Sequence, residues 1–204
     1  MGTHFYTYLA LGDSYTIGEG VPLFESFPYQ LVQLLREKKL HIHSPEIIAK
    51  TGFTTFELAE QILKTSLEEK YDFVTLLIGV NNQYRGLPLE DYKNEFTFLL
   101  HKAIHFASGK LSNVFVLSIP DWGVTPFAKD EDTKKITNEI QTFNDAAKII
   151  AQKNNVDFSD ITSRTSVVSK DASYLAQDGL HYSAKTYAEW ALPLAEKICR
   201  LMER

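Results

Sequence analysis

Three short segments of the sequence carry residue types that together could catalyse acyl transfer. Ser14 comes soon after one hydrophobic run and offers a hydroxyl nucleophile, and Asn81 comes after another run and offers a carboxamide. Near the carboxyl end, His181 lies three residues after Asp178, as a base would lie near the carboxylate that orients it. Serine-dependent acyl transfer requires a nucleophile, a base, an orienting carboxylate and an oxyanion donor. The sequence therefore predicts acyl-transfer chemistry.

Each of these residues has a definite role in that chemistry. A free serine hydroxyl is a poor nucleophile at neutral pH, so Ser14 would need His181 to remove its proton. Imidazole titrates near neutral pH and can later return the proton to the leaving group. Asp178 would accept a hydrogen bond from the other ring nitrogen, which fixes the tautomer. The Ser14 N–H, the Gly52 N–H and the Asn81 side chain would hold the oxyanion of the tetrahedral intermediate.

Each segment also has a simpler interpretation when it is taken alone. Ser14 could cap a helix, because serine is a favoured N-cap residue. Asp178 could be a capping aspartate beside a surface histidine. Gly79 and Asn81 could form a turn, since glycine and asparagine tolerate positive φ. The chemical interpretation depends on a fold that brings all the segments to one place.

Short apolar runs alternate with helical periodicity along the chain. Residues 6–11, 47–49, 73–78, 114–119 and 156–158 are the runs that predict strands. Between them, apolar residues recur at spacings of three and four, which predicts helices. These stripes are Leu31, Leu34 and Leu35; Ala59, Ile62 and Leu63; Tyr92 to Phe106; Ile136 to Ile150; and Tyr187 to Leu201. The alternation predicts an α/β fold with one five-stranded parallel sheet, covered on both faces and ordered 2-1-3-4-5 as in flavodoxin.

This fold places the chemical residues at one edge of the sheet. Ligands of such sheets bind outside the carboxyl ends of the strands. Ser14 follows the first strand and Asn81 follows the third, and these strands are neighbours in the predicted order. Residues 159–182 lack clear periodicity and predict a long functional loop, which ends on Asp178 and His181.

Four more residues lie near that edge by the same argument. Trp122 and Phe127 follow the fourth strand, where they would either wall an acyl or sugar pocket or close the core. Asn82 directly follows Asn81 and is a candidate for contact with substrate. Arg85 comes shortly afterwards and is expected in a solvated loop.

Composition and charge disfavour several classes of partner. The 204 residues are 44% hydrophobic and 23% charged, as in a soluble globular protein, and predict a single domain over residues 1–204. A net charge of -5 gives no reason to bind nucleic acid. No run reaches the ~20 apolar residues that cross a bilayer, so no stable membrane insertion is expected.

The remaining sequence features concern location and cofactors. The single Cys199 cannot form an internal disulfide, and the amino-terminal residues have no basic start, so a cytoplasmic location is expected. His101 and His105 have no third ligand nearby, and phosphate-binding glycine patterns are missing, so neither metal nor cofactor is expected. The sequence gives no indication of oligomeric state.

The three segments resemble the conserved blocks of one family. Leu11-Gly12-Asp13-Ser14-Tyr15 resembles the GDSL motif of the SGNH hydrolases, and Gly52 is similar to the glycine of the second block. Gly79-Val80-Asn81-Asn82 resembles the Gly-x-Asn-Asp block, and Asp178-Gly179-Leu180-His181 the terminal Asp-x-x-His. The resemblance extends over nearly the whole chain, in the block order of the family.

This resemblance implies a three-layer α/β/α fold and ester hydrolysis by Ser14, Asp178 and His181, without metal or cofactor. It also implies that Gly52 and Asn81 are oxyanion donors. Two residues depart from the motifs. Tyr15 replaces a leucine beside the nucleophile, and Asn82 replaces the aspartate of the third block, where it could support the loop by hydrogen bonding without the charge.

The expected activity is hydrolysis of a small-molecule carboxylic ester, either a short- to medium-chain acyl ester or an O-acetyl ester, through a covalent acyl-enzyme. A lysophospholipase or a thioesterase of the same family is an alternative. A ligand-binding domain that retains the fold without catalysis is a second alternative, and a flavodoxin-like flavin binder is a third.

Overall fold

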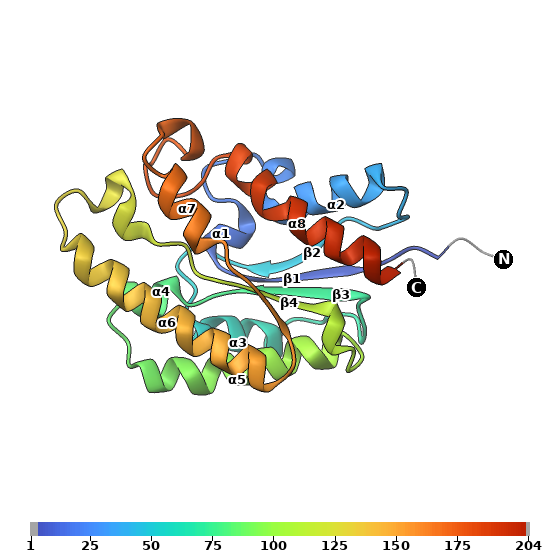
Figure 1. The fold of residues 1–204 in the computed structure, drawn as a ribbon. Coiled ribbons are helices and arrows are strands. Elements are labelled where there is room, and N and C mark those ends of the chain that lie inside the picture. Colours follow the sequence, from blue (N-terminus) through green and yellow to red (C-terminus); the bar gives the residue numbers. More distant parts are fainter. Residues whose placement is uncertain (1–3, 203–204) are drawn as a thin grey trace.

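Five parallel strands form the central sheet, in the order β2-β1-β3-β4-β5 (Figure 1). The structure is a computed structural model that describes residues 4–202. The described residues do not include 1–3 or 203–204. Part of the expectation about the amino-terminal start concerns residues 1–3 and so lies outside the described residues. The strands are β1 (Tyr8–Gly12), β2 (Glu46–Ala49), β3 (Phe73–Leu77), β4 (Val114–Leu117) and β5 (Asp157–Ser159). The predicted strand order is thereby confirmed.

Helices cover both faces of this sheet (Figure 1). One layer contains α1 (Ser14–Ile17), α2 (Phe27–Glu37), α7 (Thr162–Val168) and α8 (Ala184–Met202), and α2 packs along α8. The other layer contains α3 (Thr55–Lys64), α4 (Val80–Tyr84), α5 (Leu89–Phe106) and α6 (Thr133–Lys153). Every residue of β1, β3 and β4 is buried, because helices lie on both sides of these inner strands.

The start of α3 is fixed by a capping box. Thr54 Oγ1 accepts a hydrogen bond from the Glu57 N–H at 3.3 Å, and Glu57 Oε2 accepts one from the Thr54 N–H at 2.8 Å. These two bonds satisfy N–H groups that have no partner inside the helix. The stripe predicted for this helix is wrong in one respect, because Leu63 is 65% exposed and Leu58 is buried in its place.

The segment 159–182 is more regular than its sequence predicts. It contains α7, and a short 3-10 helix follows at Ala172–Tyr174. Serine, threonine and valine dominate α7, and these residues have weak helix propensity. Thr165 Oγ1 donates to the Ile161 carbonyl at 2.9 Å, so side-chain bonding accompanies the backbone bonds of this helix.

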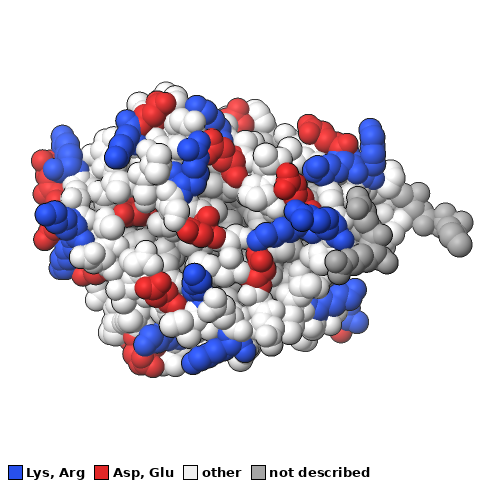
Figure 2. All heavy atoms as spheres, in the orientation of Figure 1, with Lys and Arg blue, Asp and Glu red and all other residues white. Residues whose placement is uncertain are grey.

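The described residues contain no helix that is both long enough and apolar enough to span a membrane. On the face seen in Figure 2, Lys and Arg side chains lie among Asp and Glu side chains. That face therefore carries no large field of one sign.

Candidate active site

Ser14 is the first residue of α1 and follows a tight turn at the end of β1. Asp13 is the N-cap of α1, and its Oδ1 accepts a hydrogen bond from the Tyr15 N–H at 3.0 Å. A Cβ on Gly12 would lie 2.0 Å from Thr16 Oγ1, so only glycine lets α1 fold back this closely onto the strand. The sequence thus places the Ser14 hydroxyl at the carboxyl end of β1, at the first residue of a helix.

Asp13 is a completely buried carboxyl group beside Ser14. Its Oδ2 has no hydrogen-bond partner within the described residues. Burial raises the pKa of Asp13 to about 7, although the hydrogen bond from the Tyr15 N–H favours the ionised form. The carboxyl group therefore changes its protonation state near neutral pH.

Asp178 and His181 are joined within one tight loop. Asp178 Oδ2 lies 2.6 Å from His181 Nδ1, and Oδ1 accepts hydrogen bonds from the Leu180 and His181 N–H groups at 2.9 Å each. Burial alone would raise the pKa of Asp178, but the hydrogen bonds from the His181 ring and from these two N–H groups hold it below its usual range. An ionised carboxylate therefore faces Nδ1 of the imidazole.

A cavity of about 190 Å³ lies outside the carboxyl ends of β1 and β3. Its lining includes six residues expected at the site: Ser14, Gly52, Asn81, Trp122, Phe127 and His181. Among residues 4–202, Ser14 Oγ makes no hydrogen bond, so it shares the cavity with the imidazole without being bonded to it. Catalytic hydrogen bonds often tighten only when substrate is bound.

Gly52 lies in a turn over residues 50–53 that follows β2. The Phe53 N–H donates to the Lys50 carbonyl at 3.1 Å, and Gly52 has a φ of 83°. A positive φ at the third position of such a turn is typical of type II and favours glycine. The Thr51 hydroxyl donates to Glu19. Gly52 is thereby held on the cavity wall.

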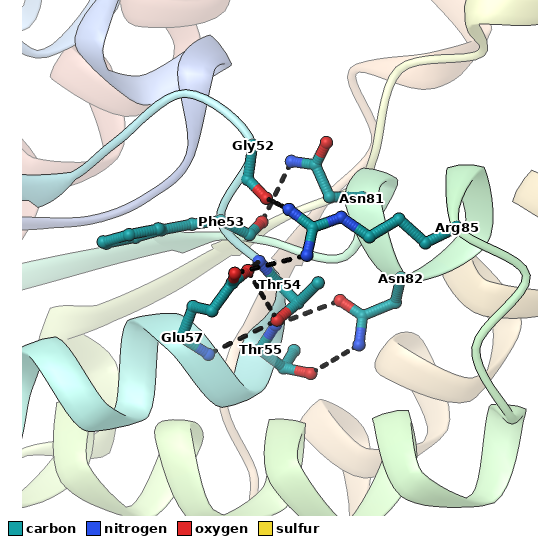
Figure 3. A network of polar contacts seen from close by, with 8 residues as sticks. All are labelled: Gly52, Phe53, Thr54, Thr55, Glu57, Asn81, Asn82 and Arg85. Carbon is teal, nitrogen blue, oxygen red and sulfur yellow. Dashed lines mark hydrogen bonds and ion pairs between the residues drawn. The ribbon is translucent and has the colours of Figure 1, made fainter.

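Asn81 lies in the first turn of α4, opposite Gly52. Its Nδ2 donates to the Phe53 carbonyl at 2.9 Å (Figure 3). An amide nitrogen carries two hydrogens, so this bond leaves the second N–H for a ligand in the cavity. One side chain thus both contacts the turn and faces the space beside Ser14.

Asn82 has a different environment from its neighbour. It is buried, its Oδ1 accepts from the Thr55 N–H at 3.0 Å, and its Nδ2 donates to Thr55 Oγ1 at 2.7 Å (Figure 3). It is absent from the described residues that line the cavity. The structure therefore places Asn82 behind the site, against the start of α3, and not where a substrate would contact it.

Aromatic side chains form part of the cavity wall. The Trp122 ring lies 5.3 Å from the ring of Tyr84 and 6.0 Å from that of Phe127, measured between centroids. Trp122 is buried, whereas Tyr84 and Phe127 are exposed at the rim. The Phe127 N–H donates to the Gly179 carbonyl at 3.2 Å, which connects this wall to the loop that carries His181.

Gln83 and Arg85 bond to residues that line the cavity, and the sequence did not predict this supporting role for either of them. Gln83 Oε1 accepts from Trp122 Nε1 at 2.7 Å, and Gln83 Nε2 donates to Glu139 at 2.9 Å. Arg85, expected in a solvated loop, donates from Nη2 to the Gly52 carbonyl at 2.5 Å (Figure 3). The only sequence signal for either residue is its position just after the Gly79–Asn82 block.

No group of three or more His, Cys, Asp and Glu residues within 4–202 could hold a metal ion. His101, one of the histidines considered as a ligand, contacts Asn154 at 3.2 Å on the surface. The functional groups that line the cavity are hydroxyl, imidazole, amide and aromatic groups.

Comparison with known proteins identifies the family. The sequence matches the GDSL-like lipase/acylhydrolase family over residues 10–189. The chain belongs to this family, and it is accordingly a hydrolase that acts on ester bonds. None of the curated protein sequences matches the chain.

Solved esterase structures share the fold. The psychrotrophic esterase EstA from Pseudoalteromonas sp. has a TM-score of 0.73 at 15% identity, covering 98% of this chain and 100% of the other. The acetylxylan esterase Axe2 from Geobacillus stearothermophilus has a TM-score of 0.74 at 19% identity, covering 97% of this chain and 96% of the other. The lipase/acylhydrolase from Enterococcus faecalis has a TM-score of 0.70 at 19% identity, covering 95% of each chain. The expected α/β/α fold of SGNH hydrolases is confirmed.

Proposed function

We propose that the protein is a serine esterase in which Ser14 is the nucleophile, His181 the general base and Asp178 the residue that orients the imidazole. One observation carries this proposal. Ser14 and His181 line the same cavity, and Asp178 lies 2.6 Å from His181 Nδ1, on the other side of the ring from Nε2. An imidazole bonded to a carboxylate through Nδ1 presents Nε2 as the basic nitrogen.

In the first half of the reaction, Ser14 Oγ attacks the ester carbonyl carbon while His181 Nε2 takes the hydroxyl proton. The resulting oxyanion is held by the N–H groups of Ser14 and Gly52 and by Asn81 Nδ2. Collapse of this intermediate breaks the bond to the alcohol oxygen, which receives the proton from His181. The products are a free alcohol and an acyl group bound to Ser14.

In the second half, water replaces the alcohol. His181 takes a proton from the water as its oxygen attacks the acyl carbon, and the same donors hold the second oxyanion. The bond to Ser14 Oγ then breaks, and His181 returns the proton to Ser14. A carboxylic acid leaves, and the enzyme is regenerated without any external oxidant, reductant or metal.

The cavity supports a small acyl group as the substrate. Its volume of about 190 Å³ is below the ~300 Å³ at which pockets for drug-sized ligands begin. A short- to medium-chain acyl ester or an O-acetyl ester fits this size. The same fold in an acetylxylan esterase supports an acetyl ester as a candidate. The aromatic wall of Trp122, Tyr84 and Phe127 would contact the acyl group or a sugar ring.

The test is hydrolysis of p-nitrophenyl esters from acetate to decanoate by the wild type and by Ser14→Ala. We expect turnover of short esters by the wild type and none by the variant, with unchanged thermal melting. A monoethylphosphonate reagent should modify Ser14, as found by mass spectrometry of the digested protein. Hydrolysis that survives in Ser14→Ala would overturn the assignment of the nucleophile. A preference for the longest esters would favour the lysophospholipase or thioesterase alternative. A folded wild type that neither hydrolyses nor reacts would favour the non-catalytic binding domain.

A further inference from the structure

Hydrogen bonds connect the turn that carries Gly52, and the residues that follow it, to side chains of α3 and α4 and to Arg85 (Figure 3). Three successive peptide groups follow Gly52, and each is bonded at both its carbonyl and its N–H. The Gly52 carbonyl accepts from Arg85 and the Phe53 N–H donates to Lys50. The Phe53 carbonyl accepts from Asn81, and the Thr54 N–H donates to Glu57.

The third peptide group completes the pattern. The Thr54 carbonyl accepts from the Leu58 N–H at 3.0 Å, and the Thr55 N–H donates to Asn82. By contrast, the Gly52 N–H, which belongs to the preceding peptide group, makes no hydrogen bond within the described residues. The Gly52 N–H therefore remains available to a ligand, and Gly52 lines the cavity.

Arg85 contributes the bond nearest to that donor. Its Nη2 donates to the Gly52 carbonyl at 2.5 Å, and its Nη1 donates to Glu57 Oε1 at 3.2 Å. Burial alone would raise the pKa of Glu57, but hydrogen bonds from Thr54 and from Arg85 hold it below its usual range. Glu57 is therefore an ionised partner that keeps the guanidinium beside the turn.

Arg85 also shares a helical turn with Asn81. The Arg85 N–H donates to the Asn81 carbonyl at 3.1 Å, at the end of α4. Asn81 binds the Phe53 carbonyl and Arg85 binds the Gly52 carbonyl. One short helix thus holds two successive carbonyls of the turn, and these two contacts set the distance between the Gly52 N–H and the Asn81 amide.

We propose that Arg85 is a positioning residue for the oxyanion hole: it holds the Gly52 peptide so that the Gly52 N–H and Asn81 Nδ2 point at the same oxygen. The proposal rests on the proposed function, and it adds a residue that lies outside the family motifs. Within the described residues, Arg85 is the only hydrogen-bond donor to the Gly52 carbonyl. Without Arg85 this carbonyl is unpaired, and the Gly52 peptide can rotate while the bonds of Thr51 and Phe53 hold the rest of the turn. A small displacement of a preorganised donor weakens transition-state stabilisation more than substrate binding.

A second role for Arg85 is distinguishable from this one. Its positive charge could act on the oxyanion from a distance, which a lysine would do as well. The positioning role needs both ends of the guanidinium fork, one on Gly52 and one on Glu57, and a lysine offers a single nitrogen in their place. The comparison of Arg85→Lys with Arg85→Met therefore separates geometry from charge.

The experiment measures kcat and KM for p-nitrophenyl acetate in the wild type, Arg85→Met, Arg85→Lys and Arg164→Met. Arg164 is the matched control, since it also bonds a glutamate through two nitrogens, at 2.8 and 3.0 Å to Glu189, without lining the cavity. We expect kcat to fall ~10- to 100-fold in both Arg85 variants, with KM changed less than ~3-fold. Arg164→Met should match the wild type.

Amide relaxation of Gly52 by 15N NMR gives a second readout that needs no turnover. We expect the order parameter of the Gly52 N–H to fall in both Arg85 variants and to stay unchanged in Arg164→Met. Full kcat in Arg85→Lys, or an unchanged Gly52 amide in Arg85→Met, would overturn the positioning role. A wild type without esterase activity would refute the proposed function, and the Gly52 amide would still decide whether Arg85 holds the turn.

Discussion

Asn82 and Thr55 are joined by two hydrogen bonds that use every polar atom of the asparagine side chain. The amide oxygen accepts from the Thr55 N–H, and the amide nitrogen donates to Thr55 Oγ1. Thr55 Oγ1 in turn donates its only proton to Glu95. An aspartate at position 82, as in the family motif, would place a second carboxylate at a hydroxyl that has one proton to give. The asparagine is therefore matched to Glu95.

This match predicts the effect of restoring the motif. Asn82→Asp should lower the free energy of unfolding by about 1–3 kcal/mol, because one buried acceptor loses its donor. Glu95→Gln should restore much of that loss in the double variant, since the new amide can donate where the carboxylate could not. Denaturant unfolding of all four proteins measures the coupling. Additive effects of the two substitutions would show that Glu95 does not determine the residue at position 82.

Asp13 predicts a pH dependence of stability. Its pKa of about 7 in the folded protein lies above the ordinary value of 3.8, so the folded state binds the proton more tightly than the unfolded chain. This tighter binding of the proton stabilises the folded state. The stabilisation is complete below pH ~4, is lost as the pH rises to ~7, and does not change further above that pH. Asp13→Asn keeps an oxygen for the Tyr15 N–H and cannot ionise.

The measurement for Asp13 is urea unfolding of the wild type and of Asp13→Asn at several pH values from 5 to 8. The free energy of unfolding of the wild type should fall relative to that of the variant by up to about 1.4 kcal/mol per pH unit until the pH reaches ~7. Other titrating groups cancel in the difference. Parallel curves over this range would show that Asp13 does not titrate there.

Replacing Gly52 should lower activity, and a control substitution at another glycine can separate this effect from a loss of stability. Gly52→Ala has room for its Cβ, whose nearest neighbour is Arg85 Nη2 at 3.5 Å, but alanine is strained at a φ of 83°. Gly109→Ala is a matched control, with a φ of 76° and nothing within 4 Å. Both should lose about 1 kcal/mol of stability. Only Gly52→Ala should lose kcat, and equal kcat in the two variants would remove Gly52 from the oxyanion hole.

Phe127 predicts a change in acyl-chain preference. Its ring stands at the rim of the cavity beside Trp122, and its removal in Phe127→Ala opens the aromatic wall. We expect kcat/KM for p-nitrophenyl octanoate, divided by that for the acetate, to rise ~10-fold. This is the size of discrimination that one contact in a hydrophobic pocket can supply. Phe98 is also an exposed phenylalanine but lies in α5, away from the residues that line the cavity. Phe98→Ala should leave this ratio unchanged. An unchanged ratio in Phe127→Ala would place the acyl group elsewhere.

The sheet can be predicted from the sequence because its inner strands are buried on both faces. Such strands require nearly continuous apolar runs, and residues 73–77 are an example in which only Thr75 is polar. Helix faces are harder to predict, as α3 illustrates. Leu58 and Ile62 lie four residues apart, and so do Ala59 and Leu63, so both pairs satisfy helical spacing. Packing against α5 determines which pair is buried, and spacing alone carries no information about it.

The same distinction applies to the candidate site. Ser14, Asn81, Asp178 and His181 can be found because each belongs to a short motif. Arg85 and Gln83 have no motif of their own, since their partners Gly52 and Trp122 lie 33 and 39 residues away along the chain. Only the folded structure shows which side chains support the turn and the aromatic wall.

The hydrogen bond from the Phe127 N–H to the Gly179 carbonyl has a consequence for enzyme engineering. The segment that carries the aromatic wall of the cavity and the segment that carries His181 are joined backbone to backbone, independently of their side chains. If Phe127 contacts the acyl group as proposed, we expect point substitutions there to alter substrate scope without moving the imidazole. Exchange of residues 122–128 for a loop of another length would break that bond, so a successful graft would transfer residues 176–181 from the same donor protein.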